Sequence, residues 1–396
     1  MSRFSVPVYG EQTCTFDLPE TWRVTLAETA KAPALSPEAI RQAFASPIGS
    51  APLRELARGS RSAAVIVEDI SRPAPTHLLV PIVVEELLAG GVPDCNIKLV
   101  SALGAHRTQT GPEFRIKMGR EMVERFEVLN QNIYENLTYL GQTEMGTPIW
   151  VNRFVAESDI KVGVGGMVPH PNAGFGGGAK IVLPGVCGME TIAHHHLKHI
   201  CSFPGQPDNP FRQDLEEVAR IVGLNFSVNA VVNDRREIAG LFVGDMVAAH
   251  RAGSRFARQL YTARVPRNAD VVISNAYPLD IDLMQAQKAF WNGPADTARE
   301  GGALVLLGRL PEGVGYHLLE GKGGRGYQPP DQNSLWPGRR LIVCSENISY
   351  GEASQIFSSR VEVFPSMAAV VEALLPHYPD AFVNLFTVGC LALVAD

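Results

Sequence analysis

Two polar clusters in the first third of the chain contain residue types suited to acid–base chemistry and anion binding. Asp69 and Arg72 lie three residues apart in a turn stiffened by prolines, where a carboxylate and a guanidinium can face one ligand. His106 follows a short β-branched run, and an imidazole, whose ordinary pKa is about 6.5, suits a general base. Each cluster also has a structural interpretation: a surface ion pair for the first, and a histidine bonded to loop backbone for the second.

A glycine-rich stretch, residues 163–180, ends in Lys180. Glycines let the backbone approach a ligand closely, and their amides can form a concave anion site. Neither common nucleotide-binding glycine motif is satisfied, since Ala179 separates the glycines from Lys180 and Ile181 follows it. Lys180 is therefore a candidate phosphate ligand or, if desolvated, a nucleophile toward a carbonyl or thiocarbonyl. Three successive glycines precede Ala179: Gly176, Gly177 and Gly178.

Three adjacent histidines occupy a predicted helix beyond this stretch: His194, His195 and His196, with His199 further along the same helix. Neutral imidazole is a common ligand of nickel and copper. Neighbouring helical residues point in different directions, so at most one or two of these rings can face a single metal ion. Solvated helical histidines are the competing interpretation.

Gln285 and Lys288 lie three residues apart on another predicted helix. They share one helical face and can reach a carboxylate across a cleft. A solvated polar face explains the same spacing, and the apolar residues between them indicate the buried side of the helix.

The composition is that of an ordinary globular protein. The 396 residues carry a net charge of −6, with 45% hydrophobic and 19% charged residues. The chain therefore has no excess of positive charge that would attract the phosphate backbone of a nucleic acid. The longest apolar stretches, 78–84 and 382–395, fall short of the roughly 18 residues of a membrane span. The first residues contain no continuous apolar core of the kind a secretory signal needs. We therefore expect a cytoplasmic protein without nucleic-acid or membrane partners.

Short β-branched runs alternate with longer segments of helical period, which predicts an α/β fold of mostly parallel sheets flanked by helices. The expected strands are 63–67, 96–100, 160–164, 270–274, 303–307 and 341–344. The expected helices are 76–90, 113–126, 214–222, 245–261, 281–291 and 367–375. A break near 264–268 predicts two domains, residues 1–265 and 270–396, with the option that the last residues return to the first domain. The polar clusters follow expected strands, at the edge where parallel sheets bind ligands.

Taken together, these segments resemble the nickel-dependent lactate racemase family, whose members racemise or epimerise small 2-hydroxy acids. The resemblance covers most of the chain and rests on five pieces in the family's order: Asp69-x-x-Arg72-Pro73, Leu103-Gly104-x-His106-Arg107, His170 ten residues before Lys180 in a Gly-Gly-x-Lys loop, His196 sixteen residues further on, and Gln285-x-x-Lys288. One piece alone is weak, whereas five in register are specific.

The resemblance implies a nickel pincer nucleotide, pyridinium-3,5-bisthiocarboxylic acid mononucleotide nickel, tethered to Lys180 through a thioamide near the three glycines. His196 would ligate nickel, with His194 and His195 as alternatives one or two positions away. His106 and His170 would be the acid–base pair, in a cleft between the domains. Substrate binding would fall to four residues: Asp69, Arg72, Gln285 and Lys288. The resemblance also implies cofactor maturation enzymes as partners.

A reaction of this kind suits two histidines. Hydride transfer from the α-carbon and removal of the hydroxyl proton give a planar 2-keto acid, which erases chirality. Return of the hydride after the ketone turns over, with the opposite histidine returning the proton, yields the other enantiomer. A dehydrogenase acting on one enantiomer needs only one such histidine.

The chain departs from the lactate-acting pattern at Met284, where the lactate enzymes carry tyrosine before the glutamine. A flexible thioether reshapes the pocket, so we expect a substrate other than lactate, such as malate, a phenyl-substituted acid or an aldonic acid. Two other classes stay open: a divalent-metal hydrolase or lyase using the histidines directly, and a non-catalytic hydroxy-acid binding protein. The segment 321–337 is expected to be a lid or a surface excursion, and the oligomeric state stays open.

Overall fold

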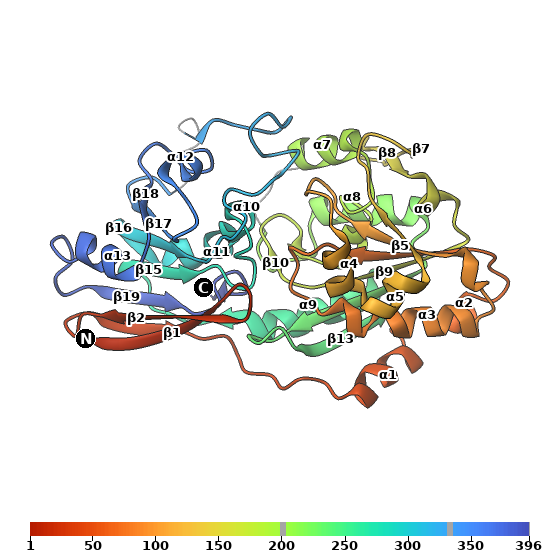
Figure 1. Cartoon of the computed structure of the whole chain (residues 1–396), viewed down its shortest axis with the longest axis horizontal. Coiled ribbons are helices and arrows are strands. Elements are labelled where there is room, and N and C mark those ends of the chain that lie inside the picture. Colours follow the sequence, from red (N-terminus) through yellow and green to blue (C-terminus); the bar gives the residue numbers. More distant parts are fainter. Residues whose placement is uncertain (199–202, 331–335, 396) are drawn as a thin grey trace. The chain divides into compact units, whose positions relative to one another are not determined.

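A computed structural model of the chain describes residues 1–198, 203–330 and 336–395, so His199 and part of the segment 321–337 lie outside it (Figure 1). The chain divides into two compact units. The larger unit comprises residues 32–168 and 172–257, and the smaller unit comprises residues 1–31, 169–171 and 258–396. None of the helices in the described residues has the length and apolar character needed to cross a membrane.

The larger unit is built on a six-stranded sheet in the order β13-β12-β9-β4-β5-β6. All neighbouring strands are parallel except β12 and β13. The chain runs from β4 outward to β5 and β6, then returns to the other side of β4 with β9 and β12, so the strand order reverses at β4. The strands of this unit are β4 (Ala63–Glu68), β5 (Ile97–Ala102), β6 (Glu127–Asn130), β7 (Leu137–Gln142), β8 (Pro148–Asn152), β9 (Ile160–Gly166), β11 (Gly174–Phe175), β12 (Phe226–Val232) and β13 (Ile238–Gly244).

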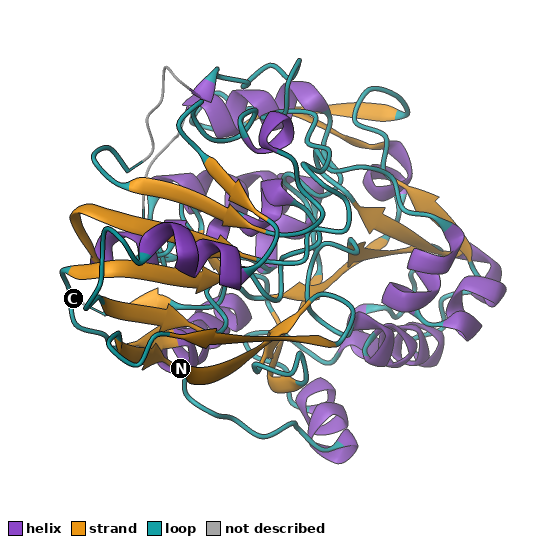
Figure 2. Cartoon of the chain, turned by 60° about the vertical axis from the view of Figure 1, so that its left-hand side comes forward, coloured by secondary structure: helices purple, strands orange, loops and turns teal. Residues whose placement is uncertain are grey.

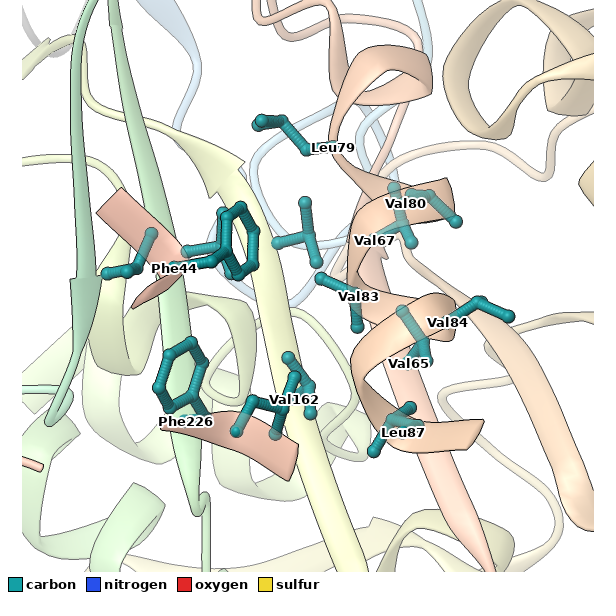
Figure 3. Close-up of a cluster of buried hydrophobic side chains, with 14 of the residues drawn as sticks. Phe44, Val65, Val67, Leu79, Val80, Val83, Val84, Leu87, Val162 and Phe226 are labelled. Carbon is teal, nitrogen blue, oxygen red and sulfur yellow. The ribbon is translucent and has the colours of Figure 1, made fainter. Parts of the chain in front are cut away.

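Apolar residues on one face of this sheet form the main core of the larger unit (Figure 3). Val65 and Val67 alternate along β4 and point toward Val83 and Leu87 of helix α3, as expected for side chains two apart on a strand. Burying each such side chain contributes about 1.5–3 kcal/mol. The helices are α1 (Pro37–Ala45), α2 (Leu53–Leu56), α3 (Val80–Ala89), α4 (Gly111–Met118), α5 (Arg120–Arg125), α6 (Arg153–Glu157), α7 (Met189–Lys198), α8 (Pro210–Val222) and α9 (Ala248–Tyr261), with short 3₁₀ helices η1 (Thr76–Leu78), η2 (Asp94–Asn96) and η3 (Gly178–Ile181).

The smaller unit contains a second six-stranded sheet, in the order β18-β17-β16-β15-β19-β3, and all its strands are parallel. Its strand order reverses at β15. Figure 2 distinguishes the strands of the sheets from the helices and loops around them. The strands are β1 (Ser2–Val8), β2 (Gln12–Leu18), β3 (Arg23–Ala27), β10 (Pro169–His170), β14 (Thr262–Ala263), β15 (Ala269–Asn275), β16 (Ala298–Leu307), β17 (Arg340–Cys344), β18 (Glu362–Phe364), β19 (Phe382–Phe386) and β20 (Leu393–Val394).

Both faces of the second sheet are covered. Val271 and Ile273 of β15 belong to a core that includes the β1–β2 hairpin and α13, while Val272 belongs to a core on the opposite face with α10, α11 and α12. A strand buried on both faces reads as a continuous apolar run, which is the pattern of β15. The helices are α10 (Leu283–Ala286), α11 (Lys288–Trp291), α12 (Tyr350–Ala353) and α13 (Met367–Leu374), with 3₁₀ helix η4 (Pro294–Thr297).

The predicted fold class, α/β with mostly parallel sheets, is confirmed, and each of the six expected strands is present. The expected helix at 113–126 is two helices, because Gly119 between α4 and α5 has a φ of 90°. The expected helix at 281–291 is likewise divided, at Gln287. The compact units differ from the expected domains in residues 1–31, 169–171 and 258–265, all of which belong to the smaller unit. The first of these segments joins it because β3 pairs with β19.

Candidate active site

Three polar segments meet the carboxyl edge of the larger sheet. Asp69 follows β4 directly, the loop with His106 follows β5, and the glycine-rich stretch follows β9. Since β9, β4 and β5 are parallel neighbours, these segments leave the sheet at the same edge. The strand order also reverses at β4, and such a reversal is where open α/β sheets bind ligands.

Asp69, His106 and Arg72 form a chain of hydrogen bonds. Arg72 donates from Nη2 to Nε2 of His106 at 3.3 Å, because a guanidinium contains only donors. The ring proton of His106 is therefore on Nδ1, which donates to Oδ2 of Asp69 at 2.8 Å. The other carboxylate oxygen of Asp69 accepts from the backbone amide of Ser71 at 2.7 Å. The network thus places a lone pair on Nε2 of His106.

The Asp69 carboxyl is only 4% exposed. Burial alone would raise its pKa, but the charge and hydrogen bond of His106, together with Arg72 and Ser71, outweigh burial and hold the pKa well below its ordinary value. Asp69 therefore stays ionised at neutral pH. An ionised carboxylate on Nδ1 orients an imidazole and stabilises the imidazolium that forms when Nε2 takes a proton.

A buried ion pair supports the turn that carries Arg72. Lys117 on α4 donates to Glu68 at 2.8 Å and to the backbone carbonyls of Ala74 at 2.7 Å and Arg72 at 3.1 Å. The second oxygen of Glu68 accepts from the Gly166 amide at the end of β9. Burial lowers the pKa of Lys117, and the charge of Glu68 opposes that shift. Sequence reasoning missed Lys117, since a lysine in a predicted helix normally indicates a solvated position.

The turn that carries Lys180 lies directly on the sheet. A Cβ atom on Gly163 of β9 would come within 2.5 Å of a side-chain carbon of Ile181, so glycine is needed there for close packing. Gly178 has a φ of 56°, and a Cβ atom on it would come within 3.0 Å of the ring of His250. These glycines are thus explained by packing within the larger unit.

The amides of the three successive glycines are partly engaged inside the protein. The Gly176 amide donates to the carbonyl of Val168 at 2.8 Å, and the Gly178 amide donates to Oδ1 of Asn229 at 2.7 Å. A concave anion site built from all three amides therefore does not match the structure. Close approach of the Gly177 backbone to a cofactor stays a prediction.

Lys180 and His196 lie around one aromatic ring, that of Phe211 on α8. The Lys180 Nζ atom lies over the Phe211 ring, 5.9 Å from its centroid. The centroid of the His196 ring lies 5.3 Å from that of Phe211, and that of His195 lies 4.1 Å away. The sequence singled out Lys180 and His196 but not the phenylalanine that brings them together.

Hydrogen bonds distinguish the three adjacent histidines. His195 is fully buried and donates from Nε2 to the carbonyl of Phe211 at 3.0 Å. His194 donates from Nδ1 to Thr147 and accepts at Nε2 from Lys198 at 2.8 Å. His196 donates from Nδ1 to the carbonyl of Ile192 at 3.1 Å. The tautomer of His196 therefore places its lone pair on Nε2, the form in which a backbone-anchored histidine ligates a metal ion.

In the smaller unit, Gln285 and Lys288 follow β15, where the strand order of that sheet reverses. Asp282 caps α10 by accepting from the Gln285 amide at 2.7 Å. Lys288 donates from Nζ to Oε1 of Gln285, and both side chains are buried. Met284 is buried beside them in sequence. His170 also belongs to this unit, in β10.

Seven of the predicted site residues thus form three groups: Asp69 with Arg72 and His106; Lys180 with His196; and Gln285 with Lys288. Among the described residues, no group of three or more histidine, cysteine, aspartate or glutamate side chains gathers in a way that would hold a metal ion.

Comparisons with known proteins place the chain among the lactate racemases. The model of the lactate racemase N-terminal domain matches residues 9–205. The lactate racemase of Lactiplantibacillus plantarum is 33% identical over 296 residues, covering 71% of this chain and 69% of that enzyme. The lactate racemase of Thermoanaerobacterium thermosaccharolyticum is 29% identical over 336 residues, covering 80% of this chain and 76% of that enzyme.

Two solved structures share the fold. The lactate racemase apoprotein from Thermoanaerobacterium thermosaccharolyticum superposes with a TM-score of 0.81 at 24% identity, with full coverage of both chains. A protein from Thermotoga maritima gives a TM-score of 0.70 at 20% identity, covering 91% of this chain and 98% of that one. The chain therefore belongs to the lactate racemase family and is an isomerase.

Proposed function

We propose that this enzyme racemises or epimerises a small 2-hydroxy acid with the help of a nickel pincer nucleotide tethered to Lys180. Family membership supports the reaction class, because the relatives are lactate racemases. The observation that carries the cofactor assignment is the placement of Lys180 and His196 around Phe211. A group joined covalently to Lys180 and ligated by His196 fits that arrangement. When bound, the nickel pincer nucleotide supplies the acceptor and donor of hydride.

Acid–base chemistry at the substrate hydroxyl falls to His106. Its Nε2 atom holds the lone pair, so this atom would take the hydroxyl proton as hydride leaves the α-carbon. The product of that step is a planar 2-keto acid. Asp69 would stabilise the imidazolium through Nδ1. We assign the opposite face to His170, which would return a proton to the ketone oxygen after the 2-keto acid has turned over.

The substrate carboxylate and oxygens would be held by Arg72, Gln285 and Lys288, with Asp69 close to His106. Arg72 is one hydrogen bond from His106, so a carboxylate on its guanidinium places the hydroxyl near the base. The placement of the substrate in a cleft between the two domains follows from the family resemblance and is part of this proposal.

We propose a 2-hydroxy acid other than lactate as the preferred substrate. Met284 stands where the lactate-acting pattern has tyrosine, and a flexible thioether in place of a phenol alters which groups fit beside Gln285. Malate, a phenyl-substituted acid and an aldonic acid are the candidates. The proposal also includes a cytoplasmic location and dependence on cofactor maturation enzymes.

The test is intact mass together with nickel content, on protein co-produced with the maturation enzymes. Wild type should carry an adduct of nucleotide size and stoichiometric nickel, and Lys180→Ala should carry neither. Lys31→Ala, which removes an exposed lysine elsewhere, is the matched control and should load like wild type. Wild type without an adduct would overturn the cofactor assignment and favour direct metal chemistry or simple binding.

A further inference from the structure

A fully buried arginine binds the loop that leads to Lys180. Arg212 lies in the first turn of α8 and is 0% exposed. Its guanidinium donates to the carbonyl of Ala173 at 3.3 Å, to that of Gly177 at 3.2 Å and to that of Phe175. One planar guanidinium therefore binds three alternate carbonyls of this loop.

A buried histidine binds the same loop from α9. His250 donates from Nε2 to the carbonyl of Gly176 at 2.9 Å, and its ring packs against Gly178. Burial, reinforced by the positive charge of Arg212, lowers the pKa of His250 well below its ordinary value. The ring is therefore neutral, and Ser254 lies 3.4 Å from its second nitrogen, Nδ1.

Arg212 is an unusual buried cation. Within the described part of the chain, no carboxylate forms an ion pair with it, because the nearby Glu216 binds Arg251 through both oxygens, at 2.6 and 3.1 Å. Burial lowers the pKa of Arg212 to about 9, so it keeps its charge at neutral pH. Since burying an unpaired charge is costly, three well-placed carbonyl dipoles must compensate.

We propose that Arg212, assisted by His250, is a positioning residue that holds the 173–177 backbone so that the Lys180 amine lies beside Phe211. Phe211 and Arg212 are consecutive residues of α8, so the same helical turn supplies both the ring under Lys180 and the guanidinium that fixes its loop. This proposal rests on the proposed function in one respect only: the reason for placing Lys180 there is attachment of the cofactor. The placement itself is testable without any cofactor.

Four variants separate positioning from general stability. Arg212→Met removes all the donors, whereas Arg212→Lys keeps the charge but cannot reach three separate carbonyls with one nitrogen. Arg220→Met is the control, because Arg220 is an exposed arginine on the same helix. If Arg212→Met fails to fold, the same comparison is made with Arg212→Lys and His250→Phe.

Two readouts use the cofactor-free protein. The first is the rate at which an amine-acylating reagent modifies Lys180 relative to Lys31, followed by peptide mass spectrometry. The second is hydrogen–deuterium exchange of residues 173–180. In folded Arg212→Lys we expect exchange in this loop to accelerate at least about tenfold and the relative acylation rate of Lys180 to change severalfold, with Arg220→Met like wild type.

The outcomes are distinguishable. Unchanged exchange and unchanged Lys180 acylation in a folded but less stable Arg212→Lys would overturn the proposal and leave Arg212 a purely structural residue. If both readouts change while wild type co-produced with the maturation enzymes carries no adduct, the positioning role stands and the proposed cofactor chemistry fails. If both change and the adduct is also reduced in Arg212→Lys, positioning of Lys180 for attachment is supported.

Discussion

Nδ1 of His106 lies 2.8 Å from Oδ2 of Asp69, while Arg72 donates to the opposite nitrogen of the same ring. The two contacts define one tautomer, with the lone pair on Nε2. The buried, ionised carboxylate of Asp69 orients the ring through Nδ1. The lone pair of His106 thus lies at a defined atom, Nε2, beside the Arg72 guanidinium.

Asp69→Asn should reduce turnover of the loaded enzyme on its 2-hydroxy acid. The amide cannot stabilise an imidazolium as a carboxylate does, and it can favour the wrong tautomer, so we expect kcat to fall roughly 100- to 10,000-fold. The measurement is racemisation followed by chiral chromatography. Asp94→Asn, at an exposed ion pair with Arg125, should retain activity. Full activity of Asp69→Asn would contradict the assignment of His106 as the base.

Asp69 should also make stability depend on acid pH. Its pKa is depressed in the folded protein, so its contribution is present above the ordinary carboxyl pKa and is lost as the pH falls through the folded-state value. Asp69→Asn should therefore have a lower urea midpoint than wild type at pH 7, and the difference should shrink below about pH 4. A difference that grew on acidification would show that the folded protein raises this pKa.

Lys117→Met should strongly destabilise the larger unit. The change leaves Glu68 buried without its cation, which typically costs about 3–5 kcal/mol. Lys117→Met combined with Glu68→Gln should recover part of this loss, because the amide oxygen can still accept from Gly166. Thermal unfolding of the single and double variants measures the coupling. Strict additivity of the two changes would show that the pair does not act as a unit.

Gly163→Ala should destabilise the turn that carries Lys180. The added methyl would come within 2.5 Å of Ile181, and overpacking of this kind costs about 1–3 kcal/mol. Ile181→Leu, which removes the opposing γ2-methyl group and keeps the side-chain volume, should restore part of the stability in the double variant. Gly111→Ala is the control, since a methyl there meets open space. Calorimetry of the four proteins provides the comparison.

Met284→Tyr should shift substrate preference toward lactate. Pocket contacts of this kind are worth about 1–3 kcal/mol, so we expect the ratio of kcat/KM for lactate to that for the preferred acid to rise roughly 10- to 100-fold. Met145→Tyr, at an exposed position, should leave the ratio unchanged. An unaltered ratio in Met284→Tyr would remove this residue from substrate selection.

Local patterns in the sequence predicted the central strands and the polar clusters that follow them along the chain. β4, β5 and β15 begin and end within two residues of their expected bounds. A short continuous run of apolar, β-branched residues is typical of a strand of a parallel sheet that is buried on both faces. The same alternation of strands and helices placed Asp69 and His106 at strand ends. The family resemblance, which is also sequence information, selected the candidate site residues from each polar cluster.

Other features depend on contacts between segments far apart in the chain. Three features join segments that are distant in the sequence. They are the hydrogen bonds from Lys117 to the Arg72 turn, the three hydrogen bonds from Arg212 to the glycine-rich loop, and the pairing of β3 with β19. A lone lysine or arginine in a predicted helix has the same local pattern whether it faces water or a buried carbonyl. Only the tertiary structure decides between a solvated and a buried position. The reason is that distant parts of the chain, packed against the side chain, determine its burial and its hydrogen bonds.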